Sequence, residues 1–275
     1  MNDLKIYHVL LDAVLIIIAW LPVVFLKNLA TPSQRGFFCD DDSIRYPYHS
    51  STVQSVTLYV VGYGTAALVI VLVEGYRAIL YEKRKYGRPS APRHRLNNKS
   101  IPYFWSQIYI YIGYLVLGGA FCSVIVNISK YTVGRLRPHF LDVCRPNLTK
   151  YCGPSSLIKP FVVDFECASH DTDRLRDARL SFPSGHAAYS CFTMMYSVLY
   201  LEARGGFLMV SRMTRPVIQL VLLSLALFTC LSRISDYKHH PFDVFAGAAL
   251  GLSVAVILDK LELDVIPPCT PLLST

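Results

Sequence analysis

The sequence predicts an all-helical integral membrane protein, and two bulk properties carry the prediction. Of its 275 residues, 53% are apolar and only 17% are charged, whereas a soluble domain carries roughly a quarter charged residues. The mean hydropathy is positive, at +0.37. Six apolar stretches approach the length of about 20 residues that a helix needs to cross a bilayer. We expect spans at about residues 6–27, 55–78, 102–128, 184–203, 216–233 and 241–261.

The first apolar stretch, residues 6–27, is expected to remain as an anchor, because it lacks a small-residue cleavage site and further spans follow it. The spans at 184–203 and 241–261 have short apolar cores and need their polar-flanked ends to complete the crossing. No internal repeat or separate soluble domain is evident. Residues 1–275 are therefore expected to form one membrane domain, with a large loop at about 131–182.

Basic residues in the short loops predict the orientation. The loop after the second span, YEKRKYGRPSAPRHRLNNKS, contains seven lysines and arginines. The loop after the fourth span adds Arg204, Arg212 and Arg215. With six spans these loops share one side, which should be the cytosol, together with both termini. The net charge of +8 suggests acidic partners, although part of it sets the topology. No nucleic-acid partner is expected.

Cysteine usage agrees with that orientation. Three cysteines, Cys122, Cys191 and Cys230, fall inside expected spans, where cysteine serves as a small apolar residue. Four others fall in the loops placed outside, where disulfides are allowed, and their pairing is left open: Cys39, Cys144, Cys152 and Cys167. The sequon at Asn147, in the large loop, is a candidate glycosylation site.

Unusual polar residues gather where four spans meet the outer face. The third span ends in SKYTVGRLRPHF, the fourth begins with SFPSGHAAYS, and SRISDYKHHPFD joins the fifth to the sixth. Six alternating spans bring these four helix ends to the same side of the membrane. We therefore expect their polar side chains to form one site.

Lys130 and Arg137 are seven residues apart, so a continuous helix would place them on one face, with Pro138 ending it. Lysine and arginine together suit a phosphate, since arginine offers a bidentate fork and lysine a point charge. The alternative is that both are basic residues of a membrane boundary that contact lipid headgroups.

In the stretch Pro183–His186 the proline is expected in the first turn of a helix. Ser184 and Gly185 would then present unpaired N–H groups, which form an anion site at a helix N-terminus. His186 would stand beside the bound anion. An ordinary capped helix start is the alternative.

His239 and Asp243 are four residues apart across another helix start. We expect the carboxylate to accept the ring N–H of the histidine, which would hold one tautomer and leave the other nitrogen nucleophilic. Two alternatives remain: an acid in a first turn is favoured by the helix dipole, and a His-His-x-x-Asp run could bind a metal. The neighbouring Lys130, Arg137 and Arg233 favour an anion over a metal cation.

These residues predict phosphoryl transfer without a metal or other cofactor. The three cations and the backbone donors would neutralise the phosphate as the transition state requires. His239 would attack phosphorus, and a protonated His186 would donate to the leaving oxygen.

The three motifs resemble the signature of the type 2 phosphatidic acid phosphatase (PAP2) superfamily, which has a haloperoxidase-like helical core. The wider chain is similar to its lipid phosphate phosphatases. The resemblance implies a phosphohistidine mechanism with His239 as nucleophile, Asp243 as its partner and His186 as the acid. It implies phosphate binding by five residues: Lys130, Arg137, Ser184, Gly185 and Arg233.

The resemblance further implies a Mg²⁺-independent enzyme acting on phosphatidic acid, lysophosphatidic acid, sphingosine 1-phosphate and ceramide 1-phosphate. It suggests a plasma-membrane protein, also found in the endoplasmic reticulum or Golgi, that forms homo-oligomers. Two rival functions stay open: a lipid phosphotransferase of the same fold, and a non-catalytic protein that binds or moves bioactive lipids. A channel or transporter ranks last, because no span carries a stripe of charges.

Overall fold

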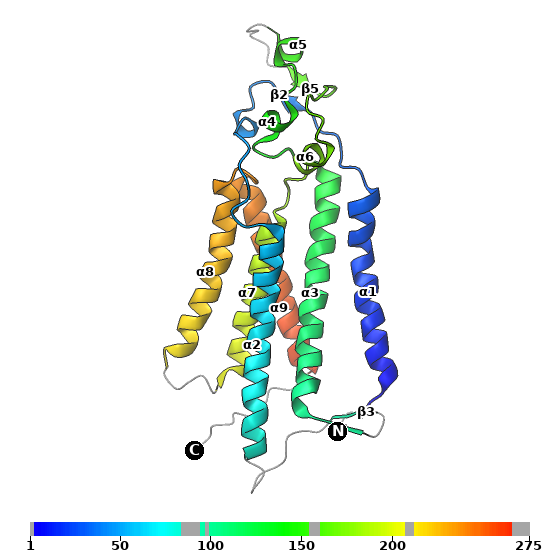
Figure 1. Ribbon diagram of the computed structural model, residues 1–275, viewed down its shortest axis with the longest axis vertical. Coiled ribbons are helices and arrows are strands. Elements are labelled where there is room, and N and C mark those ends of the chain that lie inside the picture. The colour runs from blue at the N-terminus through cyan, green and yellow to red at the C-terminus, as the bar shows by residue number, and fades with distance from the viewer. Residues whose placement is uncertain (1–2, 84–93, 97–98, 154–159, 207–211, 266–275) are drawn as a thin grey trace.

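The computed structural model describes residues 3–83, 94–96, 99–153, 160–206 and 212–265. Six long helices make up most of it: α1 (Ile6–Leu29), α2 (Ser55–Lys83), α3 (Tyr103–Val133), α7 (Gly185–Arg204), α8 (Thr214–Ser235) and α9 (Pro241–Val265). They alternate in direction, so α1, α3 and α8 end where α2, α7 and α9 begin (Figure 1). That end of the bundle is called the outer end below. Residues 84–93 and 97–98, in the loop predicted to be cytosolic, lie outside the described residues.

The helical membrane fold is confirmed, whereas the number of spans stays a prediction. Five of the described helices are long and apolar enough to cross a membrane, and α7 is not one of them. This helix packs against α2, α3, α8 and α9, so it meets protein where the other helices meet lipid. A helix in that position tolerates polar residues: the hydroxyls of Thr193 and Ser197 donate to carbonyls of α7 itself.

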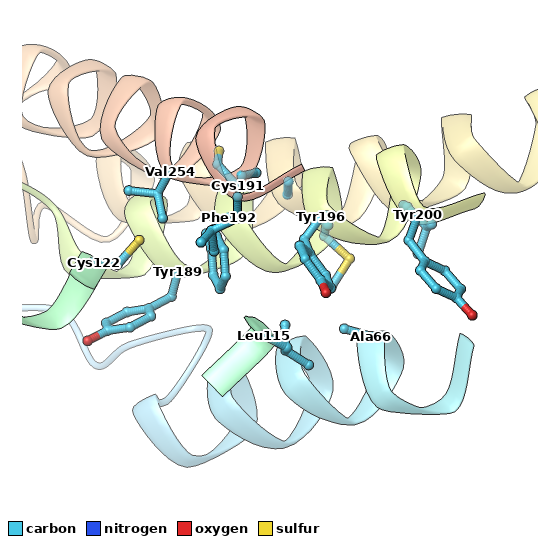
Figure 2. Packing of buried hydrophobic residues seen from close by; sticks show 14 of the residues in the cluster. Ala66, Leu115, Cys122, Tyr189, Cys191, Phe192, Tyr196, Tyr200 and Val254 are labelled. Atoms are coloured by element: carbon cyan, nitrogen blue, oxygen red, sulfur yellow. The ribbon is translucent and has the colours of Figure 1, made fainter. Parts of the chain in front are cut away.

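The main core forms around α7 (Figure 2). Phe192 and Tyr196 are almost fully buried there, together with Leu115 of α3 and Ala66 of α2. The Tyr196 hydroxyl donates to the backbone carbonyl of Tyr111 at 2.9 Å, which satisfies a polar group inside the bundle. The predicted intramembrane cysteines Cys122, Cys191 and Cys230 are buried and unpaired by disulfides.

Two glycines bring α9 against the backbone of α7. A Cβ atom at Gly251 would clash with the carbonyl oxygen of Ala188, and one at Gly247 would clash with that of Ser184. The two glycines are four residues apart, the small-xxx-small spacing that lets membrane helices approach closely. The first turn of α7 is thereby fixed relative to the first turns of α9.

We expect Gly251→Ala to lower the free energy of unfolding by about 1–3 kcal/mol, the cost of overpacking a filled core. Gly113→Ala in α3 is the matched control, because nothing lies within 4 Å of its Cβ position. Thermal unfolding of the two variants in detergent measures the difference. Equal midpoints would contradict the close α7–α9 contact.

The loops at the outer end fold into a small cap of their own. It contains α4 (Phe140–Cys144), α5 (Leu148–Cys152), α6 (Thr172–Asp177), the 3₁₀ turn Asp42–Ile44, and an antiparallel pair of strands, β2 (Phe37–Phe38) and β5 (Phe161–Val162). The disulfides Cys39–Cys152 and Cys144–Cys167 resolve the pairing that the sequence left open. The Cys39–Cys152 disulfide joins the loop between α1 and α2 to the large loop between α3 and α7.

Asn147, the predicted glycosylation site, is exposed on this cap and precedes α5, where its side chain accepts from the Lys150 N–H at 3.0 Å. Glycosylation there stays a prediction. At the opposite end, β1 (Asp3–Leu4) pairs in parallel with β3 (His94–Leu96), which pairs with β4 (Lys99–Ile101).

Candidate active site

A cavity of about 360 Å³ lies at the outer end, where the ends of the long helices meet the cap. Six of the eight predicted site residues line it: Lys130, Arg137, Gly185, His186, Arg233 and His239. Ser184 and Asp243 do not line the cavity, although both are fully buried close to residues that do. The sequence therefore placed most of its predicted site residues correctly in one cavity.

Lys130 and Arg137 reach the cavity by a route that differs from the prediction. The helix α3 ends at Val133, because Gly134 adopts a left-handed conformation with φ of 58° and its N–H bonds the Lys130 carbonyl. Arg137 therefore lies in an irregular segment, where its N–H donates to the Ala178 carbonyl at 2.8 Å. The prediction of one shared helix face was wrong, yet both cations line the cavity.

The start of α7 also differs from the prediction. Ser184 is the N-cap, with its hydroxyl accepting from the Ala187 N–H, and Pro183 precedes the helix after a cis peptide bond. The Ser184 N–H donates to the Asp243 carbonyl at 2.9 Å, so it is not free for an anion as predicted. The N–H groups of Gly185 and His186 belong to the first turn, where a helix supplies no acceptor.

The predicted contact between His239 and Asp243 was wrong. The Nδ1 atom of His239 lies 2.7 Å from the backbone carbonyl oxygen of Ser181. A carbonyl can only accept, so Nδ1 carries the proton and donates it, which leaves Nε2 as the unprotonated nitrogen. The tautomer that was predicted to depend on Asp243 is therefore fixed by the Ser181 carbonyl.

Asp243 instead holds the segments around His239. It accepts from the Ser181 hydroxyl at 2.6 Å, from Arg135 at 2.6 Å and from the His240 N–H at 3.1 Å. It is the third residue of α9 and reaches back to the N–H before that helix, as an acid in a capping box does. This local bond explains the failed prediction, because capping turns the carboxylate away from His239. Among the described residues, no three His, Cys, Asp or Glu side chains converge to hold a metal.

His186 faces the cavity with a polar atom unused. Its Nε2 is buried and has no hydrogen-bond partner among the described residues. The ring also makes a hydrogen bond with the backbone of Val53, in the stretch between α1 and α2. A buried polar atom without a partner is costly unless a ligand or water meets it. Nε2 of His186 is thus available to a reacting group.

The charges lining the cavity are strongly unbalanced. Five cationic side chains and one carboxylate are among the described lining residues: Lys27, Lys130, Arg137, Arg233, Lys238 and Asp177. Arg233 is 1% exposed and donates to Asp236 at 2.9 Å. Arg137 donates to Asp177 at 2.6 Å. Such a wall favours an anion with more than one negative charge.

The same charges act on the groups that titrate there. Burial alone would raise the pKa of Asp177, but Arg137, Lys130 and Lys238 outweigh it and hold that pKa below its usual value. Burial, followed by Arg137 and Lys130, holds the pKa of His239 well below its usual value. His239 is therefore neutral at physiological pH, as a nitrogen nucleophile must be.

Several residues that build this site were not predicted from the sequence. Ser181 contacts His239 and Arg135 contacts Asp243. The cavity is also lined by Asp177, Lys27, Tyr48 and Lys238. Lys238 directly precedes the predicted nucleophile, so its place beside the motif could have indicated it as a site residue. Asp177 and Ser181 lie in the large loop, where no periodicity shows which side chains turn inward.

The geometry agrees with what comparison with known proteins finds. The PAP2 superfamily matches residues 108–263, which is more than half of the chain. The chain belongs to the PAP2 superfamily. Three further matches support this, and no solved structure matches the chain.

The chain is 34% identical to a putative phosphatidate phosphatase of Drosophila melanogaster, over 92% of this chain and 68% of that protein. It is 35% identical to phospholipid phosphatase 1 of Rattus norvegicus, over 91% of this chain and 83% of the relative. It is 34% identical to phospholipid phosphatase 2 of Homo sapiens, over 90% and 80% respectively. The similarity therefore covers most of this chain and most of each relative.

Proposed function

We propose that this PAP2 protein is a lipid phosphate phosphatase that uses a phosphohistidine intermediate and no metal ion. Its substrates are phosphatidic acid, lysophosphatidic acid, sphingosine 1-phosphate and ceramide 1-phosphate. The observation that carries the proposal is the cavity itself, in which His186, His239 and five cations line one space at the end of a bundle of apolar helices. The names of two relatives supply phosphatidate and phospholipids as the substrate class, and the two sphingolipid phosphates rest on the family resemblance alone.

In the first step, Nε2 of His239 attacks phosphorus as the bond from phosphorus to the lipid oxygen breaks. Protonated His186 gives its proton to that oxygen, so the lipid leaves as a neutral alcohol. Burial, followed by the charges of Arg233 and Lys130, holds the pKa of His186 well below its usual value. Protonation of the ring therefore depends on the negative charge of the bound phosphate, which favours the charged form. Lys130, Arg137 and Arg233 stabilise the charge on the three equatorial oxygens.

In the second step, water attacks phosphorus and the bond to His239 breaks, releasing inorganic phosphate. His186, now neutral, takes the proton of the attacking water and returns to its starting state. The Ser181 carbonyl, 2.7 Å from Nδ1 of His239, stabilises the positive ring in the intermediate. Asp243 acts through Ser181 as a positioning residue.

Features at the outer end support an extracellular or luminal site. Two disulfides and the exposed Asn147 sequon lie on the cap above the cavity, and disulfides persist in oxidising compartments. The basic short loops belong to the opposite end, as cytosolic loops do. A plasma-membrane location, with further copies in the endoplasmic reticulum or Golgi, fits this orientation. Homo-oligomers remain part of the proposal through the family resemblance alone.

The test is release of inorganic phosphate from phosphatidic acid by the detergent-solubilised protein in EDTA. His239→Ala, at equal expression, supplies the background from contaminating phosphatases. Phosphate release by the wild type above that background is the expected result. Activity that needs an added divalent metal would overturn the metal-free mechanism. Transfer of labelled phosphate to another lipid would favour the phosphotransferase. If no phosphate is released or transferred under any condition, the non-catalytic lipid-binding protein is favoured.

A further inference from the structure

Lys238 places an ammonium group in the cavity, one residue before the nucleophile. The residue is only 4% exposed, although lysine is rarely buried without a partner. Its backbone is fixed, because its N–H donates to the Arg233 carbonyl at 3.0 Å. The side chain lines the same cavity as His186 and His239. No part of the three-motif signature includes it.

The acids near Lys238 are committed to other groups. Asp177 bonds Arg137 at 2.6 Å, and Asp236 bonds Arg233 at 2.9 Å and the Thr52 N–H at 2.8 Å. Among the described residues, no carboxylate forms an ion pair with the Lys238 ammonium. Burial, and then the charge of Arg137, lower the pKa of Lys238 to about 8. The cavity therefore holds a cation that lacks an anion.

An aromatic ring holds this cation in place. The Nζ atom of Lys238 lies 3.7 Å from the centre of the Tyr48 ring, within the range of a cation–π interaction. Tyr48 is itself fixed, since its N–H donates to Asp142 of α4 at 2.9 Å. The ring attracts the positive charge without neutralising it, so the ammonium keeps its charge and N–H donors for a phosphate oxygen.

We propose that Lys238 is a further phosphate-binding residue of the substrate site, held in position by the ring of Tyr48. It binds a phosphoryl oxygen next to the phosphorus atom that His239 attacks, and adds a fourth positive charge to Lys130, Arg137 and Arg233. This assignment rests on the proposed function for the identity of the substrate. The binding of a phosphate-like anion does not depend on it.

Orthovanadate, a tetrahedral phosphate analogue, tests the assignment without requiring turnover. Its affinity is measured by the rise in the thermal unfolding midpoint of the full chain in detergent. We expect Lys238→Gln to weaken orthovanadate binding at least about tenfold, the loss of one charge-assisted hydrogen bond. Lys238→Arg, which keeps the charge, should bind within about threefold of the wild type. Lys150→Gln is the matched control, because Lys150 also lies over a ring, that of Tyr151 at 5.1 Å, but away from the cavity.

A second pair of variants keeps the test decisive if Lys238→Gln does not fold. Tyr48→Phe retains the ring face and should keep more of the affinity for orthovanadate than Tyr48→Leu does. Tyr48→Leu removes the ring face and should weaken binding about two- to tenfold. Unchanged binding in Lys238→Gln, or equal loss in Lys238→Gln and Lys238→Arg, would overturn the assignment, as would equal binding by the two Tyr48 variants.

The assignment and the proposed function fail in different ways. If the wild type binds orthovanadate through Lys238 but releases no phosphate from phosphatidic acid, the phosphatase proposal fails and the anion site stands. If phosphate is released and Lys238→Gln retains both orthovanadate affinity and the KM for phosphatidic acid, the role of Lys238 is excluded and the phosphatase stands.

Discussion

His239→Ala is expected to lower kcat for phosphatidic acid by at least about 10³-fold, because in the proposed mechanism its ring forms the covalent intermediate. Its Nδ1 is committed to the Ser181 carbonyl at 2.7 Å, so Nε2 is the nitrogen left to attack. Burial keeps the ring neutral by holding its pKa well below the usual value. Inorganic phosphate released per minute, at matched protein concentration, measures the loss.

Trapping the intermediate gives the same prediction a second readout. With phosphatidic acid labelled in its phosphate, a denaturing quench of the wild type should leave label on the protein, in the acid-labile and base-stable form that phosphohistidine takes. The His239→Ala protein should carry none. His170→Ala is the matched control, because His170 is an exposed histidine of the outer loop. Label of equal amount on His239→Ala would place the nucleophile elsewhere.

The sequence predicted the residues that line the cavity better than it predicted their partners. Lys130, Arg137, His186, Arg233 and His239 all line it, because six alternating helices must bring four motif-bearing ends together. That inference depends only on topology and on spans of the right length. It therefore survives errors of several residues in where each helix ends.

The hydrogen-bond partner of each site residue depends on backbone conformations that the spacing of residues in the sequence does not reveal. The left-handed Gly134 ends α3 four residues before the predicted stop at Pro138, and so moves Arg137 off the helix. Capping of α9 draws Asp243 to the His240 N–H and away from His239. In both places a hydrogen bond at a helix end sets the direction of the backbone or of the side chain, and residue spacing alone does not reveal that bond.

The large outer loop was beyond sequence reasoning for a different reason. Ser181 contacts His239 across 58 positions of sequence, and Asp177 contacts Arg137 across 40. Irregular segments have no period from which an inward-facing side chain could be inferred. The cap fixes these segments through two disulfides whose pairing the sequence could not supply.

His186→Gln is expected to lower kcat for phosphatidic acid by about 10²–10⁴-fold, the usual contribution of a general acid–base group. The lipid alkoxide is a poor leaving group without a proton. In the proposed mechanism Nε2 of His186 supplies that proton, and this buried atom has no hydrogen-bond partner among the described residues. The second step should slow as well, because the attacking water loses its base. A drop in kcat of less than about tenfold would exclude this role.

A substrate with a better leaving group distinguishes the role of His186 as acid from the role of His239 as nucleophile. p-Nitrophenyl phosphate releases a phenolate that needs no proton, so the first step should proceed in His186→Gln while the second remains slow. The expected result is a burst of about one nitrophenolate per active site, because the phosphoenzyme forms quickly and is hydrolysed slowly. His239→Ala should give no burst, because it cannot form the intermediate. If His186→Gln loses the burst with this substrate as fully as it loses lipid turnover, His186 binds the phosphate and donates no proton to the leaving group.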